Sequence, residues 1–130
     1  MVLVAAEAIT QRQLTALMKR WQKKLRLQDW RIKARLISQA EMVAKETEYG
    51  QDAETCVGFC EPLPESKVAT ISILRPENAV EGHEGVDLDI EATLVHEMLH
   101  CHFAPLTTSD TKLMVEQTIE AITEALLRDD

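Results

Sequence analysis

The sequence has few aromatic residues, which make up 4% of its 130 residues, and glycine and proline occur only four times each. A collagen-like chain is excluded because it needs abundant glycine, and a disordered chain is excluded by an apolar content of 45%. No apolar run approaches the roughly 18 residues of a membrane-spanning helix, so we expect no membrane association. The core is therefore expected to consist of Leu, Ile, Val, Met and Ala side chains.

Cysteine is also scarce, and the three cysteines, Cys56, Cys60 and Cys101, are an odd number that argues against a disulfide framework. Cys56 and Cys60 are separated by three residues, so they do not form a CxxC motif of the zinc or redox type. The apolar first residues lack a basic leader and are interrupted by Glu7, so we expect no signal peptide. We therefore predict free thiols in a reducing compartment, the cytoplasm.

Charge is distributed unevenly along the chain, whose formal net charge is −8. Residues 1–35 carry +7, and the remaining residues carry −15. The basic segment 12–35 has two interpretations, a nucleic-acid contact surface or a solvated basic face beside an acidic body. We favour the solvated face, because the net charge is negative and no nucleic-acid-binding motif accompanies the bases.

The length predicts a single domain over residues 1–130, because two halves would each be too small for a good core. Residues 10–26 read as a helix that begins with a Thr10–Gln13 capping box. Its predicted apolar stripe comprises Leu14, Leu17, Met18, Trp21 and Leu25. Residues 29–38 alternate apolar and basic side chains, which is typical of a half-buried strand. Residues 39–54 are compatible with a polar loop or with a short helix near 40–46.

The second half predicts a hairpin followed by two helices. Residues 55–60 and 67–74 read as its strands, with a turn at Pro62–Ser66 between them. A loop over 75–86 precedes a helix that is capped by Asp87 or Asp89 and ends near residue 103. A last helix, capped by Ser109 or Asp110, runs to about residue 127 with an apolar stripe of Val115, Ile119, Ile122 and Leu126. The fold class is therefore α+β, with about three strands.

The first of these two helices contains the pattern HExxH, in which His96 and His100 lie one turn apart on the same face. Both imidazoles can reach one metal ion there, and Glu97 can act as general base toward a water molecule that the metal activates. The alternative is a helix with hydrogen-bonded surface histidines. We favour the metal site, because the flanking residues are apolar and a buried helix has no structural need for these polar side chains.

A catalytic zinc ion needs a third protein ligand and an open position. His102 lies two residues beyond His100 and faces away from the predicted site. The remaining candidates are acidic residues of the last helix, Asp110, Glu116, Glu120 and Glu124. We choose Glu116, which flanks the apolar stripe. We assign Glu120 as the partner of a ligand histidine, or as the alternative ligand one turn further on.

The HExxH pentapeptide with an acid on the following helix resembles the zincin metallopeptidases, and among them the gluzincins. Their Glu-x-x-x-Asp spacing is similar to Glu116–Glu120 here, and the order of elements over residues 67–125 resembles a minimal zincin core. The chain also resembles the small HExxH proteins of phage and prophage genomes. It lacks the Asn-Glu-x-x-Ser-Asp sequence of the gluzincins.

The resemblance implies a Zn²⁺-dependent peptidase with Glu97 as general base and His96, His100 and Glu116 as metal ligands. Strand 67–74 would then border the cleft, where an extended peptide or protein substrate adds to the strand edge. Candidates for stabilising the oxyanion are Tyr49, His83 and His102. The alternative function is a non-catalytic module, stabilised by zinc, that binds a protein or associates with nucleic acid.

Overall fold

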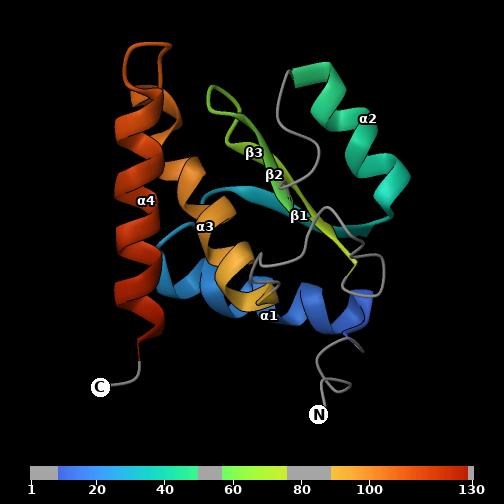
Figure 1. Ribbon diagram of the computed structural model, residues 1–130. Coiled ribbons are helices and arrows are strands. Elements are labelled where there is room, and N and C mark those ends of the chain that lie inside the picture. The colour runs from blue at the N-terminus through green and yellow to red at the C-terminus, as the bar shows by residue number, and fades with distance from the viewer. Residues whose placement is uncertain (1–8, 50–56, 76–88, 129–130) are drawn as a thin grey trace.

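The computed structural model describes residues 9–49, 57–75 and 89–128, without the side chains of residues 46, 48 and 49, and has an α+β architecture (Figure 1). Its elements are α1 (Gln11–Lys24), β1 (Arg31–Ile37), α2 (Gln39–Tyr49), β2 (Gly58–Leu63), β3 (Val68–Leu74), α3 (Ile90–Phe103), the short 3-10 helix η4 (Ala104–Leu106) and α4 (Lys112–Leu127). The predicted α+β class, with an N-terminal helix, three strands and two C-terminal helices, is confirmed. The predicted loop over 75–86 lies, apart from Arg75, outside the described residues.

Helix α1 begins as its sequence predicts. Thr10 Oγ1 accepts a hydrogen bond from the Gln13 backbone N–H at 3.1 Å, and Gln13 Oε1 accepts one from the Thr10 N–H at 2.8 Å. Three members of the predicted stripe are buried, Leu14, Met18 and Trp21. The helix ends at Lys24, two residues before the prediction, and Arg26 adopts the left-handed region with φ of 60°.

The three strands form a mixed sheet in the order β1-β3-β2. Strand β3 pairs in parallel with β1 and antiparallel with β2, so the predicted hairpin is confirmed. Its first strand runs over 58–63 and not 55–60, and residues 55 and 56 lie outside the described residues. The predicted turn is wrong by two residues, because Pro62 belongs to β2 and the turn occupies residues 64–67. Proline is tolerated at this position because β2 is an edge strand of this sheet, where a missing N–H need not break the ladder.

The pairing also corrects the expectation that strand 67–74 borders the cleft. Strand β3 lies in the centre of the sheet, with β1 on one side and β2 on the other. Strand β2 is the edge strand that packs against the helix of residues 90–103, which carries the HExxH pattern. Gly58 of β2 lies close to Thr93 of this helix. Any cleft beside that helix is therefore bordered by β2.

The main core lies between one face of the sheet and helices α1, α3 and α4. It includes Leu14 and Trp21 of α1, Leu36 and Ile71 of the sheet, Met98 of α3 and Ile119 of α4. Figure 1 shows α3 between the sheet and α4. Helix α3 therefore packs against other elements on several sides, which fixes its position.

Helix α2 lies against the other face of the sheet. Met42 is fully buried in a second cluster with Ile37, Phe59 and Leu74, and Lys45 forms an ion pair with Glu61 at 2.9 Å. The segment that the sequence left undecided is thus a helix over 39–49, longer than the helix near 40–46 that we considered. Ser38 and Glu41 exchange hydrogen bonds at its start, an S-x-x-E signature.

Helix α4 begins later than predicted. Its N-cap is Thr111, not Ser109 or Asp110, because Thr108 and Thr111 exchange backbone-to-hydroxyl hydrogen bonds at 2.8 and 3.2 Å ahead of the helix. The predicted stripe is wrong at Leu126, which is 44% exposed. Thr123 takes the buried position, because its hydroxyl donates to the Ile119 carbonyl at 2.8 Å.

A side-chain amide covers the outer edge of β1. Gln11 Nε2 donates to the Ala34 carbonyl at 2.7 Å, and the Leu36 N–H donates to Gln11 Oε1 at 3.0 Å. We expect Gln11→Ala to lower the free energy of unfolding by about 1–2 kcal/mol, because both backbone groups lose a partner. Urea denaturation would measure this loss, with Arg12→Ala as the control. Equal stabilities of the two variants would contradict the role of Gln11.

Candidate metal centre

Helix α3 carries the HExxH pattern and is anchored by its apolar residues. Asp89 caps it by accepting a hydrogen bond from the Ala92 N–H at 3.1 Å, as one of the two predicted caps. Buried side chains cover much of its circumference: Leu94, Val95, Met98, Leu99 and Cys101. His96 and His100 occupy the remaining half-buried stripe, which faces α4.

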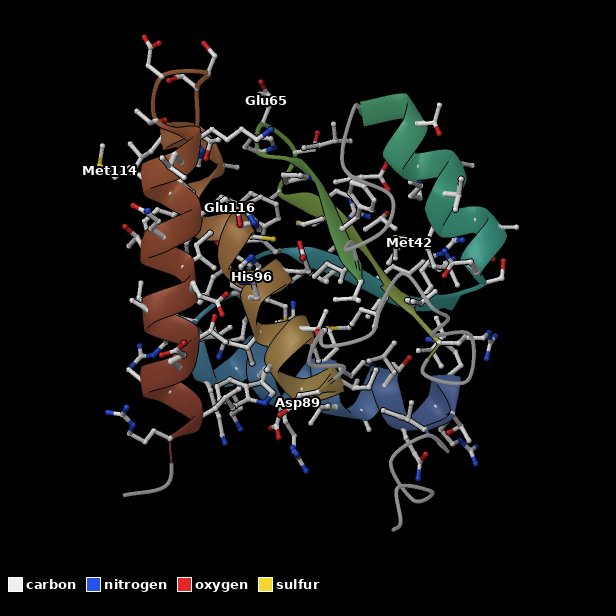
Figure 2. The ribbon with its side chains drawn as sticks, viewed as in Figure 1. Met42, Glu65, Asp89, His96, Met114 and Glu116 are labelled. Carbon is white, nitrogen blue, oxygen red and sulfur yellow. The ribbon has the colours of Figure 1, made fainter. Side chains whose placement is uncertain are left out.

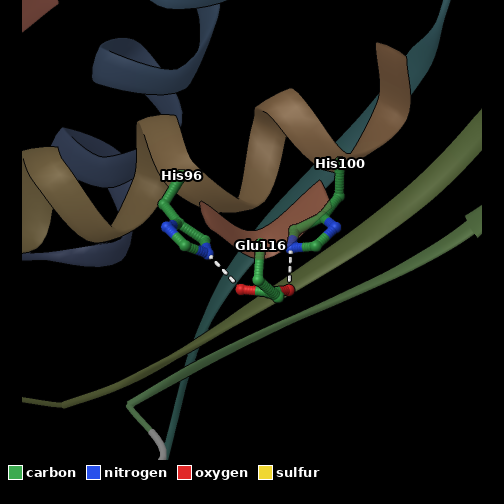
Figure 3. Close-up of side chains that lie close together, drawn as sticks. All are labelled: His96, His100 and Glu116. Carbon is green, nitrogen blue, oxygen red and sulfur yellow. Dashed lines mark hydrogen bonds and ion pairs between the residues drawn. The ribbon is translucent and has the colours of Figure 1, made fainter. Parts of the chain in front are cut away.

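His96 and Glu116 meet at the interface of α3 and α4 (Figure 2), and His100 belongs to the same cluster. His96 Nε2 lies 3.1 Å from Glu116 Oε1, and His100 Nε2 lies 2.9 Å from Glu116 Oε2. The two imidazoles therefore point at the same carboxylate, one at each oxygen (Figure 3). One nitrogen or oxygen atom of each residue lies within 4.8 Å of those of the other two, a spacing that could hold a metal ion.

Glu120 lies on the other side of the His96 ring. Its Oε1 is 2.9 Å from His96 Nδ1, while Glu116 faces Nε2 of the same ring. Glu120 is not a member of the His96–His100–Glu116 cluster. Glu116 thus faces both histidines, and Glu120 faces the other nitrogen of the His96 ring, where it can orient this ring.

The side chain of Glu97 extends toward strand β2 of the sheet. Its side chain is half-buried, and its Cγ and Oε2 lie close to Gly58 of β2. Burial raises the pKa of the Glu97 carboxyl, although the neighbouring histidines act in the opposite direction. Glu97 is therefore not one of the three clustered side chains, and its environment favours its protonated form more than water does.

The neighbouring carboxylates favour the protonated form of His96. Loss of hydration acts to lower the pKa of His96, but the hydrogen bond with Glu116 and the surrounding negative charges outweigh it and raise this pKa to about 9. Hydrogen bonds from His100 and His96 hold the pKa of the Glu116 carboxyl well below its usual range. Both ring nitrogens of His96 face carboxylates, and only an imidazolium donates from both.

The pKa of His96 predicts how the chelated, metal-free protein depends on pH. Because this pKa is about 9 in the folded chain against 6.5 ordinarily, protonation stabilises the fold below pH 6.5, and this stabilisation is lost as the pH rises through about 9. We expect the free energy of unfolding to fall by on the order of 2 kcal/mol over this range, the value of a hydrogen bond to a charged group. Urea denaturation at several pH values would show it. A fall of the same size in His96→Gln would contradict the assignment.

The other polar candidates do not join the cluster. His102 faces away, as predicted, and its Nε2 lies 2.7 Å from the Leu25 carbonyl at the end of α1. His83 and the side chain of Tyr49 lie outside the described residues. Cys60 and Cys101 are free thiols, as predicted, whereas Cys56 is not described. A hydrogen bond with Cys101 and burial raise the pKa of the Cys60 thiol, which favours an unreactive thiol.

The basic segment 12–35 is divided between two sides of the molecule. Helix α1 packs on the sheet face that carries Ala34 and Leu36. Arg31, Lys33 and Arg35 alternate with these residues along β1 and so point to the opposite face, where Arg35 forms an ion pair with Glu41 at 3.0 Å. The segment therefore does not present its bases on one face.

Within the described residues, no helix combines the length and the apolar character needed to cross a membrane. Comparisons of the chain with protein-family models, with characterised proteins and with solved structures find no match.

Proposed function

We propose that this chain is a zinc-dependent metallopeptidase of a minimal zincin type. The observation that carries the proposal is the meeting of the two HExxH histidines with Glu116 of the next helix. The HExxH pattern predicts two metal ligands and a base from local spacing alone. The third candidate ligand, Glu116, lies 16 positions beyond His100. We include in the proposal a peptide or protein substrate and the cytoplasmic location expected from the cysteines.

The donor set fits zinc. Two imidazole nitrogens and one carboxylate oxygen are a usual ligand set of catalytic zinc, which keeps a fourth position open, whereas structural zinc is usually closed by four protein ligands. His96, His100 and Glu116 would hold the ion. A bound zinc ion supplies a Lewis acid that polarises a peptide carbonyl and activates water for attack.

The other acidic residues have distinct roles in this proposal. Glu97 takes a proton from the attacking water and passes it to the leaving amine, a task suited to a carboxyl whose pKa burial has raised. Glu120 accepts a hydrogen bond from His96 Nδ1, which fixes the tautomer and leaves Nε2 free to act as a ligand. In this proposal, zinc binding, orientation of His96 and proton transfer therefore each depend on a different carboxyl group.

Metal removal and replacement test the proposal. The zinc-loaded protein is expected to hydrolyse members of a quenched fluorogenic peptide library, to lose this activity after chelation and to regain it with one equivalent of zinc. Fluorescence and elemental analysis would be followed on the same samples. A protein that binds one zinc ion per chain yet cleaves no peptide would instead indicate the non-catalytic, zinc-stabilised module.

A further inference from the structure

Gly58 begins strand β2 at the place where this strand meets α3. A Cβ atom built at this glycine would lie 2.8 Å from Thr93 Cγ2, 3.1 Å from Glu97 Oε2 and 3.2 Å from Glu97 Cγ. The first contact is shorter than carbon atoms tolerate, and the other two are tighter than ordinary van der Waals contact. An alanine at position 58 therefore requires a neighbouring group to move.

The requirement for glycine here is one of space. The backbone of Gly58 is not in the left-handed region, and an ordinary strand residue would accept its conformation. A glycine in a strand often marks the close approach of another group. Here that group is the HExxH helix, through the side chains of Thr93 and Glu97.

The two neighbours differ in their freedom to move. Thr93 is β-branched and has few χ1 rotamers in a helix, and α3 is fixed by its buried residues. The carboxylate of Glu97 is the free end of a longer, flexible side chain. A side chain at position 58 is therefore expected to displace the Glu97 carboxylate while the helix keeps its place.

We propose that Gly58 is a positioning residue, whose missing side chain lets the Glu97 carboxylate lie against β2 beside the histidine cluster. The inference rests on the proposed function as far as proton transfer by Glu97 is concerned. The contact itself does not depend on that function. Nothing in the sequence pattern indicates it, because Gly58 and Glu97 are 39 positions apart.

The test separates displacement of Glu97 from general disturbance of the helix by using Thr93→Ser as the background. This substitution removes the methyl group behind the 2.8 Å contact and leaves both Glu97 contacts in place. Thr93→Ser alone is expected to keep the activity of the wild type. Leu63→Ala is the control for a change in β2, because Leu63 is 58% exposed at the other end of the strand.

Adding Gly58→Ala to Thr93→Ser is expected to lower kcat about 10- to 100-fold on a quenched fluorogenic peptide that the wild type cleaves, because small misplacements of catalytic groups have effects of this size. KM is expected to stay within about threefold, and zinc content at one ion per chain, since no ligand changes. A kcat equal to that of Thr93→Ser would overturn the proposal. Loss of zinc would overturn it too, because the ligands would then have moved.

A crystal structure of the same double variant tests the contact without any assay. The Glu97 carboxylate is expected to be displaced from its position in Thr93→Ser, with His96 and His100 unmoved. An unmoved Glu97 would overturn the inference even if the protein proves to be a peptidase. Conversely, a displaced Glu97 in a protein that cleaves no peptide would support the positioning role and contradict the proposed function.

Discussion

Glu97→Gln is expected to lower peptide hydrolysis by about 10²- to 10⁴-fold, the usual contribution of a general base. Glutamine has nearly the same shape as glutamate but cannot accept a proton. The structure places Glu97 outside the cluster of His96, His100 and Glu116, so the variant is expected to bind as much zinc as the wild type. The loss should therefore appear in kcat at full zinc occupancy.

Glu124→Gln provides the matched control for this variant, because Glu124 is exposed on α4 and lies outside the cluster. It is expected to leave hydrolysis and zinc content unchanged. Glu97→Gln with wild-type activity would contradict the assignment of Glu97 as base. Loss of zinc from Glu97→Gln would instead show that this carboxylate is a ligand.

The second large effect concerns the two acidic residues of α4. We expect Glu116→Ala to weaken zinc binding by more than about 100-fold, because it removes a ligand, and Glu120→Ala to weaken it by about 10- to 100-fold, the usual effect of removing the partner of a ligand. The two variants are expected to differ in zinc affinity because the two carboxylates face different ring nitrogens. Glu116 lies between both Nε2 atoms, whereas Glu120 contacts only Nδ1 of His96.

Competition with a chromophoric chelator would give the two affinities. The pH must be held constant, since protons compete with zinc for His96, whose pKa is about 9 without metal. The same ranking is expected at every pH. A larger loss in Glu120→Ala than in Glu116→Ala would contradict the ligand assignment and move the third ligand one turn along α4.

The parts of the fold that the sequence predicts well are governed by local interactions. The Thr10–Gln13 capping box marks the start of α1, and the HExxH spacing places His96 and His100 on one face of α3. Glu116 could be chosen because the apolar stripe of α4 shows which side of that helix faces the core. These features depend on residues within a few positions of one another.

The features that the sequence does not reveal depend on contacts between distant segments. The alternation in residues 67–74 is the same in a central strand as in an edge strand, so the sequence does not reveal the parallel pairing of β3 with β1. The sequence does not decide between loop and helix for residues 39–54 because, of the described side chains of α2, Met42 alone is fully buried, although Ser38 and Glu41 carry a capping signature. Thr123 appears polar in sequence and is buried through a hydrogen bond within its own helix.

The packing of α3 and α4 explains how a small domain can hold the His96–His100–Glu116 cluster in place. Helix α3 is fixed by buried side chains, and α4 packs beside it through Val115 and Ile119, which flank Glu116. Hydrogen bonds that Glu116 and Glu120 accept from the imidazoles orient both rings. Such preorganisation would lower the cost of ordering these side chains if the cluster binds a metal.

X-ray absorption at the zinc edge, measured on the protein loaded with one equivalent of zinc, would report the ligands of the metal ion. We expect nitrogen and oxygen ligands at roughly 2.0–2.1 Å, the scattering pattern of two imidazoles and no sulfur at roughly 2.3 Å. The Glu116→Ala variant should lose this spectrum or change it. A sulfur ligand would indicate that cysteine thiols bind the metal, and a single imidazole would show that only one of the two HExxH histidines does. Either result would contradict a zinc site built from His96, His100 and Glu116.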